Sequence, residues 1–244
     1  MPLRLRPPLD AERLTPGLLV ARRGFFGTVA AACAAASLPG SRAIWRDRQD
    51  PGDWTMARFV AEVTPVCKEL LTDTSARGQD RYLLTLASFA VRLGAVPTPD
   101  ARQVGEGHRI GSHHGPEPFT VLHWLLEPGA RIQPHAHTYG NVVTLGLAGM
   151  ARVDNFEVVG ERDYASTEPV VVQRTHQQLL RPGDVNLVSL ERSYVHGFVA
   201  GPQGAAGLDI TTRIAAKQPT PLLTLGEPLD REAMTFAARW TTGG

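Results

Sequence analysis

Three histidines have the residue type and spacing of a metal site. His135 and His137 are separated by a single residue, in the segment between Gly129 and Gly149. Side chains alternate along a β-strand, so residues two apart point to the same face. Imidazole nitrogens bind iron, zinc, copper or nickel, and three of them fill one face of a coordination sphere. The spacing therefore predicts a chelating pair on the inner face of a strand.

The third ligand must come from another part of the chain. His196 follows the turn Pro182-Gly183-Asp184 by a strand and a loop, so a hairpin would return it beside the pair. We predict His196 as the third ligand, with His176, just before that turn, as the alternative. Tyr139 and Asn141 lie just beyond the pair and are predicted to bind substrate or dioxygen through hydrogen bonds. A tyrosine in a turn equally suits packing.

The elements that would position these residues are β-strands. After about residue 105 the chain consists of short runs rich in valine, leucine and threonine, separated by Gly, Pro and Asp turns. Such a succession predicts a mainly β domain, a double-layered jelly roll, over residues 105–244, with the tail from Gln218 wrapping its surface. The predicted strands are Phe119 to Leu126, Asn141 to Leu147, Ala151 to Val159, Val170 to Gln173, Val185 to Leu190, His196 to Ala200 and Leu208 to Ile214. The other histidines are given simpler roles: His108, His113 and His114 in an exposed loop, and His123 inside the barrel.

The segment around the histidine pair resembles the first sequence motif of the cupins. That motif is a glycine, five residues, His-x-His, a spacer of three or four residues, a glutamate, six residues and a second glycine. Gly129, His135, His137 and Gly149 match it at the four-residue spacing. The resemblance covers about residues 105 to 214 and implies a cupin double-stranded β-helix, which is a jelly-roll barrel.

The second cupin motif is matched more loosely, and one ligand of the first is missing. Pro182, Gly183 and His196 fit the second motif, with a longer gap before the histidine. Val142 stands at the position of the family's glutamate, and Asn141 at its three-spaced alternative. A three-histidine site is similar to that of the thiol dioxygenase branch, which includes cysteine dioxygenase. The resemblance implies Fe²⁺ on the three histidines, with open positions for a thiolate and dioxygen.

The resemblance to this branch suggests one substrate-binding residue in the chain. Three other residues of the branch are absent from the chain. Arg109 stands 26 residues before His135, where cysteine dioxygenase has an arginine that pairs with the substrate carboxylate. The alternative is a surface arginine in a loop. Gly207, Asp209 and Thr211 occupy positions where the family has a serine, a histidine and a tyrosine.

The predicted function is a metal-dependent dioxygenase that oxidises a small carboxylated thiol. Its partners would be that small molecule and dioxygen. Two alternatives keep the barrel: another metal-dependent cupin enzyme with zinc, nickel or copper, and a non-catalytic cupin that binds a small ligand. The formal net charge of +1 gives no electrostatic footprint for nucleic acid. No apolar run reaches the roughly 18 residues of a membrane-spanning helix.

Residues 44–104 are predicted to be helical and to pack on the barrel. Phe59, Val63, Val66 and Leu70 recur at helical spacing, and Asp53 can cap that helix. A second helical pattern from Tyr82 ends before the Pro97 to Asp100 breaker segment. Cys67 is predicted to be a small buried residue on the first helix.

Residues 1–43 resemble a twin-arginine export signal. Arg22 and Arg23 precede a weakly apolar, alanine-rich stretch that ends at Ser41-Arg42-Ala43. Cleavage after Ala43 and a periplasmic or secreted protein are the expectation. The alternative is a helical N-terminal arm on a cytoplasmic protein.

Overall fold

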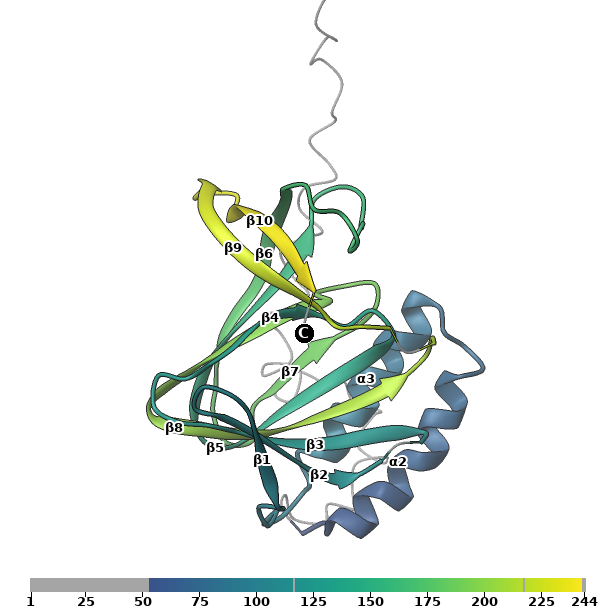
Figure 1. Cartoon of the computed structure of the whole chain (residues 1–244). Helices are drawn as coiled ribbons and strands as arrows, with labels where there is room; N and C mark the ends of the chain where they lie inside the picture. The colour runs from purple at the N-terminus through teal and green to yellow at the C-terminus, as the bar shows by residue number, and fades with distance from the viewer. Residues whose placement is uncertain (1–52, 116, 217, 243–244) are drawn as a thin grey trace, which may run out of the picture. The chain divides into compact units, whose positions relative to one another are not determined.

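The computed structural model describes residues 53–242 except 116 and 217, and Figure 1 shows their path from helices to strands. The helices are α2 (Met56–Leu70) and α3 (Ala76–Ala90). The strands are β1 (Ala101–Gly105), β2 (His108–His114), β3 (Phe119–Leu126), β4 (Arg131–Ala136), β5 (Gly140–Val158), β6 (Val170–Leu180), β7 (Val185–Val188), β8 (Val195–Arg213), β9 (Pro221–Asp230) and β10 (Thr235–Thr242). The predicted leader lies outside the described residues.

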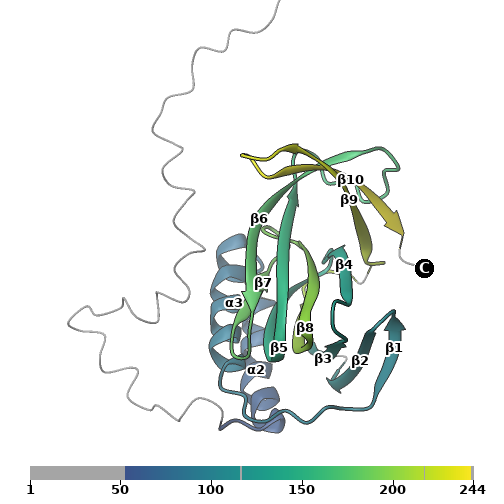
Figure 2. The ribbon, with the colours of Figure 1, turned by 90° about the vertical axis from the view of Figure 1, so that its left-hand side faces the viewer.

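The fold is mainly β, with a closed antiparallel barrel and two helices before it, as predicted. The strand order is β1-β2-β3-β8-β4-β9-β10-β6-β5-β7, and β8 also pairs with β5. β5 and β8 run side by side through the barrel (Figure 2), paired from Gly140↔Arg213 to Phe156↔Val195. One layer contains β1, β2, β3 and β7 with the Gly140 half of β5, and the other contains β4 and β6 with the Val158 half. This is a double-layered jelly roll.

The long strands β5 and β8 were each predicted as two shorter strands. The pairing continues through the expected breaks, with register shifts between Gly146 and Ala148 and between Gly149 and Ala151. At Gly149 φ is +63°, and a Cβ there would lie 2.2 Å from the Gly204 carbonyl oxygen. Glycine accepts this backbone conformation and this close approach, so the two strands bend without leaving the sheet.

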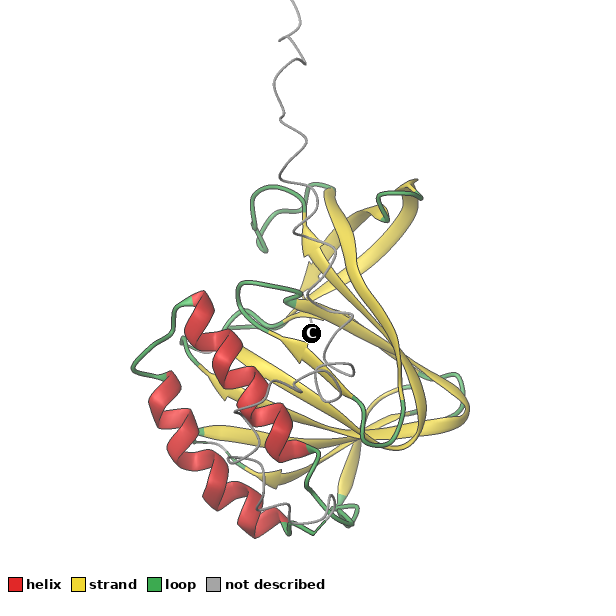
Figure 3. Cartoon of the chain, turned by 180° about the vertical axis from the view of Figure 1, so that it is seen from behind, coloured by secondary structure: helices red, strands yellow, loops and turns green. Residues whose placement is uncertain are grey.

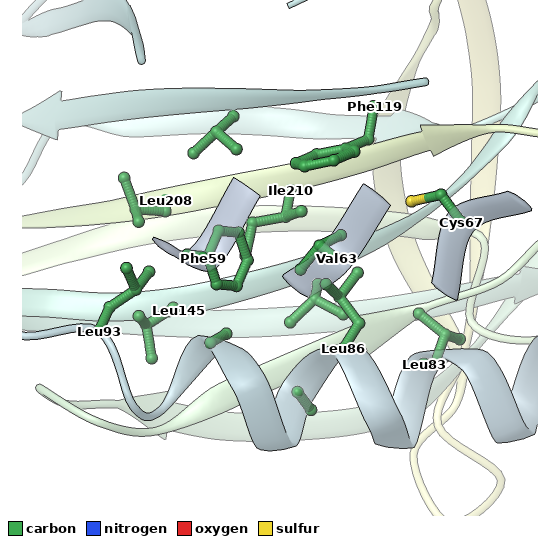
Figure 4. Close-up of a cluster of buried hydrophobic side chains, with 14 of the residues drawn as sticks. Phe59, Val63, Cys67, Leu83, Leu86, Leu93, Phe119, Leu145, Leu208 and Ile210 are labelled. Carbon is green, nitrogen blue, oxygen red and sulfur yellow. The ribbon is translucent and has the colours of Figure 1, made fainter. Parts of the chain in front are cut away.

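Both helices cover the outer face of the first layer, and Figure 3 shows them side by side in red. In Figure 4, Phe59 and Val63 of α2 and Leu86 of α3 point toward Leu208 and Ile210 of β8. Thr55, and not Asp53, caps α2, because its side chain accepts a hydrogen bond from the Arg58 N–H. None of the described helices combines the length and apolar character that crossing a bilayer requires.

Cys67 is buried on the apolar side of α2, as predicted. Its Sγ lies 3.0 Å from the Tyr82 hydroxyl, which also hydrogen-bonds to Thr212 of β8. Burial raises the pKa of the Cys67 thiol. Cys67 is therefore a packing residue between helix and sheet with low reactivity.

Two segments that were not predicted as strands belong to the sheet. His108, His113 and His114 lie on β2 and are partly buried, not in an exposed loop. The tail forms the β9–β10 hairpin, which pairs with β6 and β4. These strands were missed because glycines, prolines and charged residues interrupt the alternation of apolar and polar positions.

Candidate metal centre

Two neighbouring strands bring the three histidines together. His135 lies on β4 and is paired with His196 of β8 in the register. His137 follows the end of β4, where its N–H donates to the Tyr194 carbonyl at 2.8 Å. Adjacent paired strands place opposite side chains on one face, so His135 and His196 point the same way. The predicted strand carries the first histidine, and a backbone hydrogen bond fixes the second.

The three imidazoles form a compact triangle. Their ring centroids are separated by 4.7 to 4.9 Å, and one nitrogen of each lies within 4.8 Å of the others. The Nε2 atoms of His137 and His196 are 2.9 Å apart. Metal–nitrogen bonds of about 2.0–2.1 Å at right angles also place two donors about 2.9 Å apart. The spacing of His137 and His196 therefore matches two adjacent positions on an octahedral metal.

Burial keeps the three imidazoles neutral. His196 has no exposed surface and His137 retains 9% of its own. Burial holds the pKa of both well below 6.5, and the neighbouring His135 adds to this effect. The pKa of His135 is lowered by burial as well. Because a metal binds the unprotonated nitrogen, the site offers three ready donors at neutral pH.

Hydrogen bonds at the far side of two rings orient their Nε2 atoms inward. Nδ1 of His135 lies 3.0 Å from the Gln133 carbonyl oxygen, and Nδ1 of His196 lies 3.5 Å from Oδ1 of Asn186. Both partners are acceptors, so each Nδ1 carries the proton. The Asn186 amide in turn donates to Oδ1 of Asn155 at 2.7 Å. This arrangement suits histidines that bind a metal through Nε2.

No carboxylate joins the histidine triangle among the described residues. Val142, at the position of the family glutamate, is fully buried and paired with Val188 and Thr211. The alternative third ligand, His176, lies on β6, where its Nε2 is 3.2 Å from Oε1 of Gln178. The group that can hold a metal is thus His135, His137 and His196.

Arg109, which was predicted to bind the substrate carboxylate, lies away from the histidine triangle. Arg109 on β2 is exposed and paired with Leu125, and it lines an outer cavity of about 230 Å³ beside Gly149 and Gln203. Leu125 alternates with Trp124, whose ring faces the interior, so Arg109 is on the outer face of the layer.

Asn141 and Tyr139 are the other two residues that were predicted to bind substrate. Asn141 is fully buried and paired with Thr212, whose hydroxyl contacts the helices. Tyr139 is partly buried, and its carbonyl accepts hydrogen bonds from the N–H groups of Ile214 and Ala215. The pairing with Thr212 places Asn141 on the helix-facing side of the sheet, and the prediction for the Tyr139 side chain stays a prediction. His123, expected inside the barrel, is paired with Leu208 on the helix-facing side and lies 3.1 Å from His113.

Sequence reasoning did not assign roles to several residues of the inner wall. Asn155 and Asn186 lie behind His196, and Asp209 accepts a hydrogen bond from Thr144 at 2.6 Å. The available signal was a single polar residue between apolar neighbours: Asn186 between Val185 and Leu187, and Asp209 between Leu208 and Ile210. Such residues face the interior when their neighbours face the outside.

Comparison with solved structures returns proteins of low sequence identity to this chain. KdgF from Halomonas sp. is 18% identical, with a TM-score of 0.35, over 47% of this chain and 86% of that one. An RmlC-like cupin from Shewanella frigidimarina is 18% identical, with a TM-score of 0.34, over 47% and 84%. The coconut allergen cocosin is 18% identical, with a TM-score of 0.36, over 46% and 28%. The strand pairing itself, and not these likenesses, shows the fold to be a double-layered jelly roll. No family model matches the chain, and no curated protein does.

Proposed function

We propose that this cupin is a metal-dependent oxygenase that binds ferrous iron through His135, His137 and His196 and oxidises a small thiol. The observation that carries the proposal is the convergence of three neutral imidazoles, with no carboxylate in the described group. Neutral donors leave the full charge of a divalent metal available to an anionic ligand such as a thiolate.

Bound iron would supply positions for the thiolate and dioxygen beside each other. The reaction takes RSH and O₂ to the sulfinic acid RSO₂H, so both oxygen atoms enter the product and no further reductant is required. The chain's contribution is positional. Asn186 accepts the Nδ1 proton of His196, the ring of Phe198 lies 4.8 Å from the ring of His196, and the ring of Trp124 lies 5.4 Å from that of Phe198, measured between centroids.

The sequence prediction specified a carboxylated thiol, with Arg109 as its anchor. Arg109 lies on the outer face of β2, so its position lends no support to that part of the prediction. We therefore keep the thiol in the proposal and assign no group at its other end.

Metal content and oxygen uptake test the proposal. Protein loaded with Fe²⁺ without oxygen should bind one iron per chain and then consume one O₂ per thiol oxidised. His135→Ala should abolish both, whereas His176→Ala, a histidine outside the triangle, should retain both. Uptake with none of a panel of small thiols would refute the oxygenase. Zinc, nickel or copper bound in protein purified without added metal would favour the alternative metal enzymes, and ligand binding that is independent of His135 would favour a non-catalytic cupin.

We also propose that the protein acts in the periplasm or outside the cell. The support is the arginine pair Arg22-Arg23 with the alanine-rich stretch that follows it. A reporter fused after residue 43 should be exported, and replacing both arginines with lysine should stop export.

A further inference from the structure

Two buried asparagines form a reciprocal pair behind the ligand His196. Asn155 lies on β5 opposite His196 in the register, and Asn186 lies on β7. The Asn186 amide donates to Oδ1 of Asn155 at 2.7 Å, and the Asn155 amide donates to Oδ1 of Asn186 at 3.4 Å. Asn155 has no exposed surface and Asn186 is nearly as buried. The direction of these hydrogen bonds is therefore decided by the protein groups around the pair.

A pair of amides can satisfy itself in two orientations. If both side chains turned over together, each donor would take the place of an acceptor, and both hydrogen bonds would remain in the reverse direction. The two orientations differ only in what they present to their neighbours. In one of them Asn186 presents its oxygen to Nδ1 of His196, and in the other it presents an N–H group. A third group must select between them.

The Ser193 carbonyl is the group that selects the orientation. It accepts a hydrogen bond from the Asn155 amide at 3.4 Å, and a backbone carbonyl has no proton to donate. The turned-over pair would place the Asn155 oxygen against this carbonyl, so that two acceptors would face each other in a buried place. The N–H of Ser193 donates to the Glu157 carboxylate at 2.8 Å, which holds the turn before β8 in place.

The series of hydrogen bonds ends at the metal ligand. With the Asn155 amide directed at Ser193, Oδ1 of Asn186 faces Nδ1 of His196 at 3.5 Å and can only accept. The imidazole then carries its proton on Nδ1 and leaves the Nε2 lone pair free for a metal. A turned-over Asn186 would donate to Nδ1, which would put the proton on Nε2 and block metal binding there.

We propose that Asn155 is a positioning residue of the metal centre. Anchored on the Ser193 carbonyl, it turns the Asn186 oxygen toward His196 and so selects the imidazole tautomer that binds a metal. The assignment applies to any divalent metal that the three histidines hold, and it does not depend on the oxygenase chemistry.

Two measurements on the full chain test the assignment. Long-range proton–nitrogen NMR correlation spectra of metal-free protein at neutral pH distinguish the Nδ1–H and Nε2–H forms of His196. Competition with a chromophoric chelator gives the Kd for Zn²⁺. Wild-type His196 should be in the Nδ1–H form. Asn155→Leu removes the anchored amide, so Asn186 can turn and donate to Nδ1. In this variant His196 should take the Nε2–H form, and the Kd for Zn²⁺ should rise by about 10- to 100-fold.

Thr175→Val is the matched control. The Thr175 hydroxyl hydrogen-bonds to Oγ of Ser193 at 3.0 Å and to the Asn155 carbonyl at 3.4 Å. This variant also removes hydrogen bonds next to Asn155, but it leaves the amide pair and its anchor. Its His196 tautomer should be that of the wild type, and its Kd for Zn²⁺ should stay within about threefold of the wild-type value.

The outcomes separate a positioning role from a structural one. An Nε2–H form of His196 in the wild type would overturn the assignment, as would an Asn155→Leu protein with unchanged tautomer and Zn²⁺ affinity. Equal losses of affinity in Asn155→Leu and Thr175→Val would also overturn it. Where the leucine variant does not fold, the wild-type tautomer decides, and Asn155→Asp, which keeps an acceptor toward Asn186, should retain that tautomer. Failure of the wild type to bind any metal would refute the proposed function, while the tautomer would still decide this assignment.

Discussion

Replacing Asp209 with asparagine should stabilise the protein at neutral pH. Burial raises the pKa of this carboxyl group from 3.8 to about 6, which makes its ionised form about 3 kcal/mol less favourable in the folded protein than in the unfolded chain. Between those two pH values the folded state holds more protons than the unfolded state. The contribution of Asp209 to the free energy of unfolding of the wild type is therefore fully present below pH 3.8, falls as pH rises, and is lost above about pH 6. Asparagine is similar in size, accepts the hydrogen bond from Thr144 and carries no charge.

Urea unfolding of both proteins from pH 4 to pH 8, in the presence of a chelator, measures this effect. The free energy of unfolding of Asp209→Asn should exceed that of wild type by up to about 3 kcal/mol at pH 7.5, and the difference should shrink toward pH 4. The buried histidines change the stability of both proteins in the opposite direction, since stability is lost as they are protonated at low pH. Their contribution cancels in the difference. A difference that is independent of pH, or a variant less stable than wild type at pH 7.5, would refute the reasoning.

Three further substitutions test the surroundings of the site. Asn186→Ala removes the acceptor at Nδ1 of His196 and should weaken metal affinity by about 10- to 100-fold in a competitive titration, at unchanged saturating stoichiometry. Gly197→Ala should also weaken it, and lower stability by about 1–3 kcal/mol in urea, because a Cβ there would lie 2.9 Å from the Pro134 backbone nitrogen, beside a ligand strand. Phe59→Ala should lower the free energy of unfolding in urea by about 3–5 kcal/mol, while the metal stoichiometry stays at the wild-type level. A lower metal stoichiometry would show that helix packing positions the ligands.

The close spacing of His135 and His137 could be predicted from sequence because two residues along a strand fix a common face. The motif resemblance identified His196, but the predicted hairpin does not bring it there: the pairing of β8 with β4 places His196 opposite His135. Arg109 and Asn141 were placed by motif spacing alone. Spacing along the chain does not state which face a side chain occupies, and the register puts both on outer faces, paired with Leu125 and Thr212.

The fold class could be predicted from local sequence patterns, whereas the lengths of the strands could not. A succession of valine- and threonine-rich runs separated by turns requires a layered β structure, and the helical period of α2 is regular. The continuity of β5 across Gly149 depends on a carbonyl contributed by Gly204, 55 residues later in the chain. The β9–β10 hairpin owes its place to partners on β6 and β4. Such non-local pairing overrides local propensity.

The bend of β5 and β8 determines how the two layers of the barrel face each other. The metal ligands come from the layer with β4, and Asp209 comes from the layer with β3, yet His196 and Asp209 belong to the same strand. The register shifts near Gly149 separate these two halves of β8, so one bend sets the separation of ligand and carboxylate.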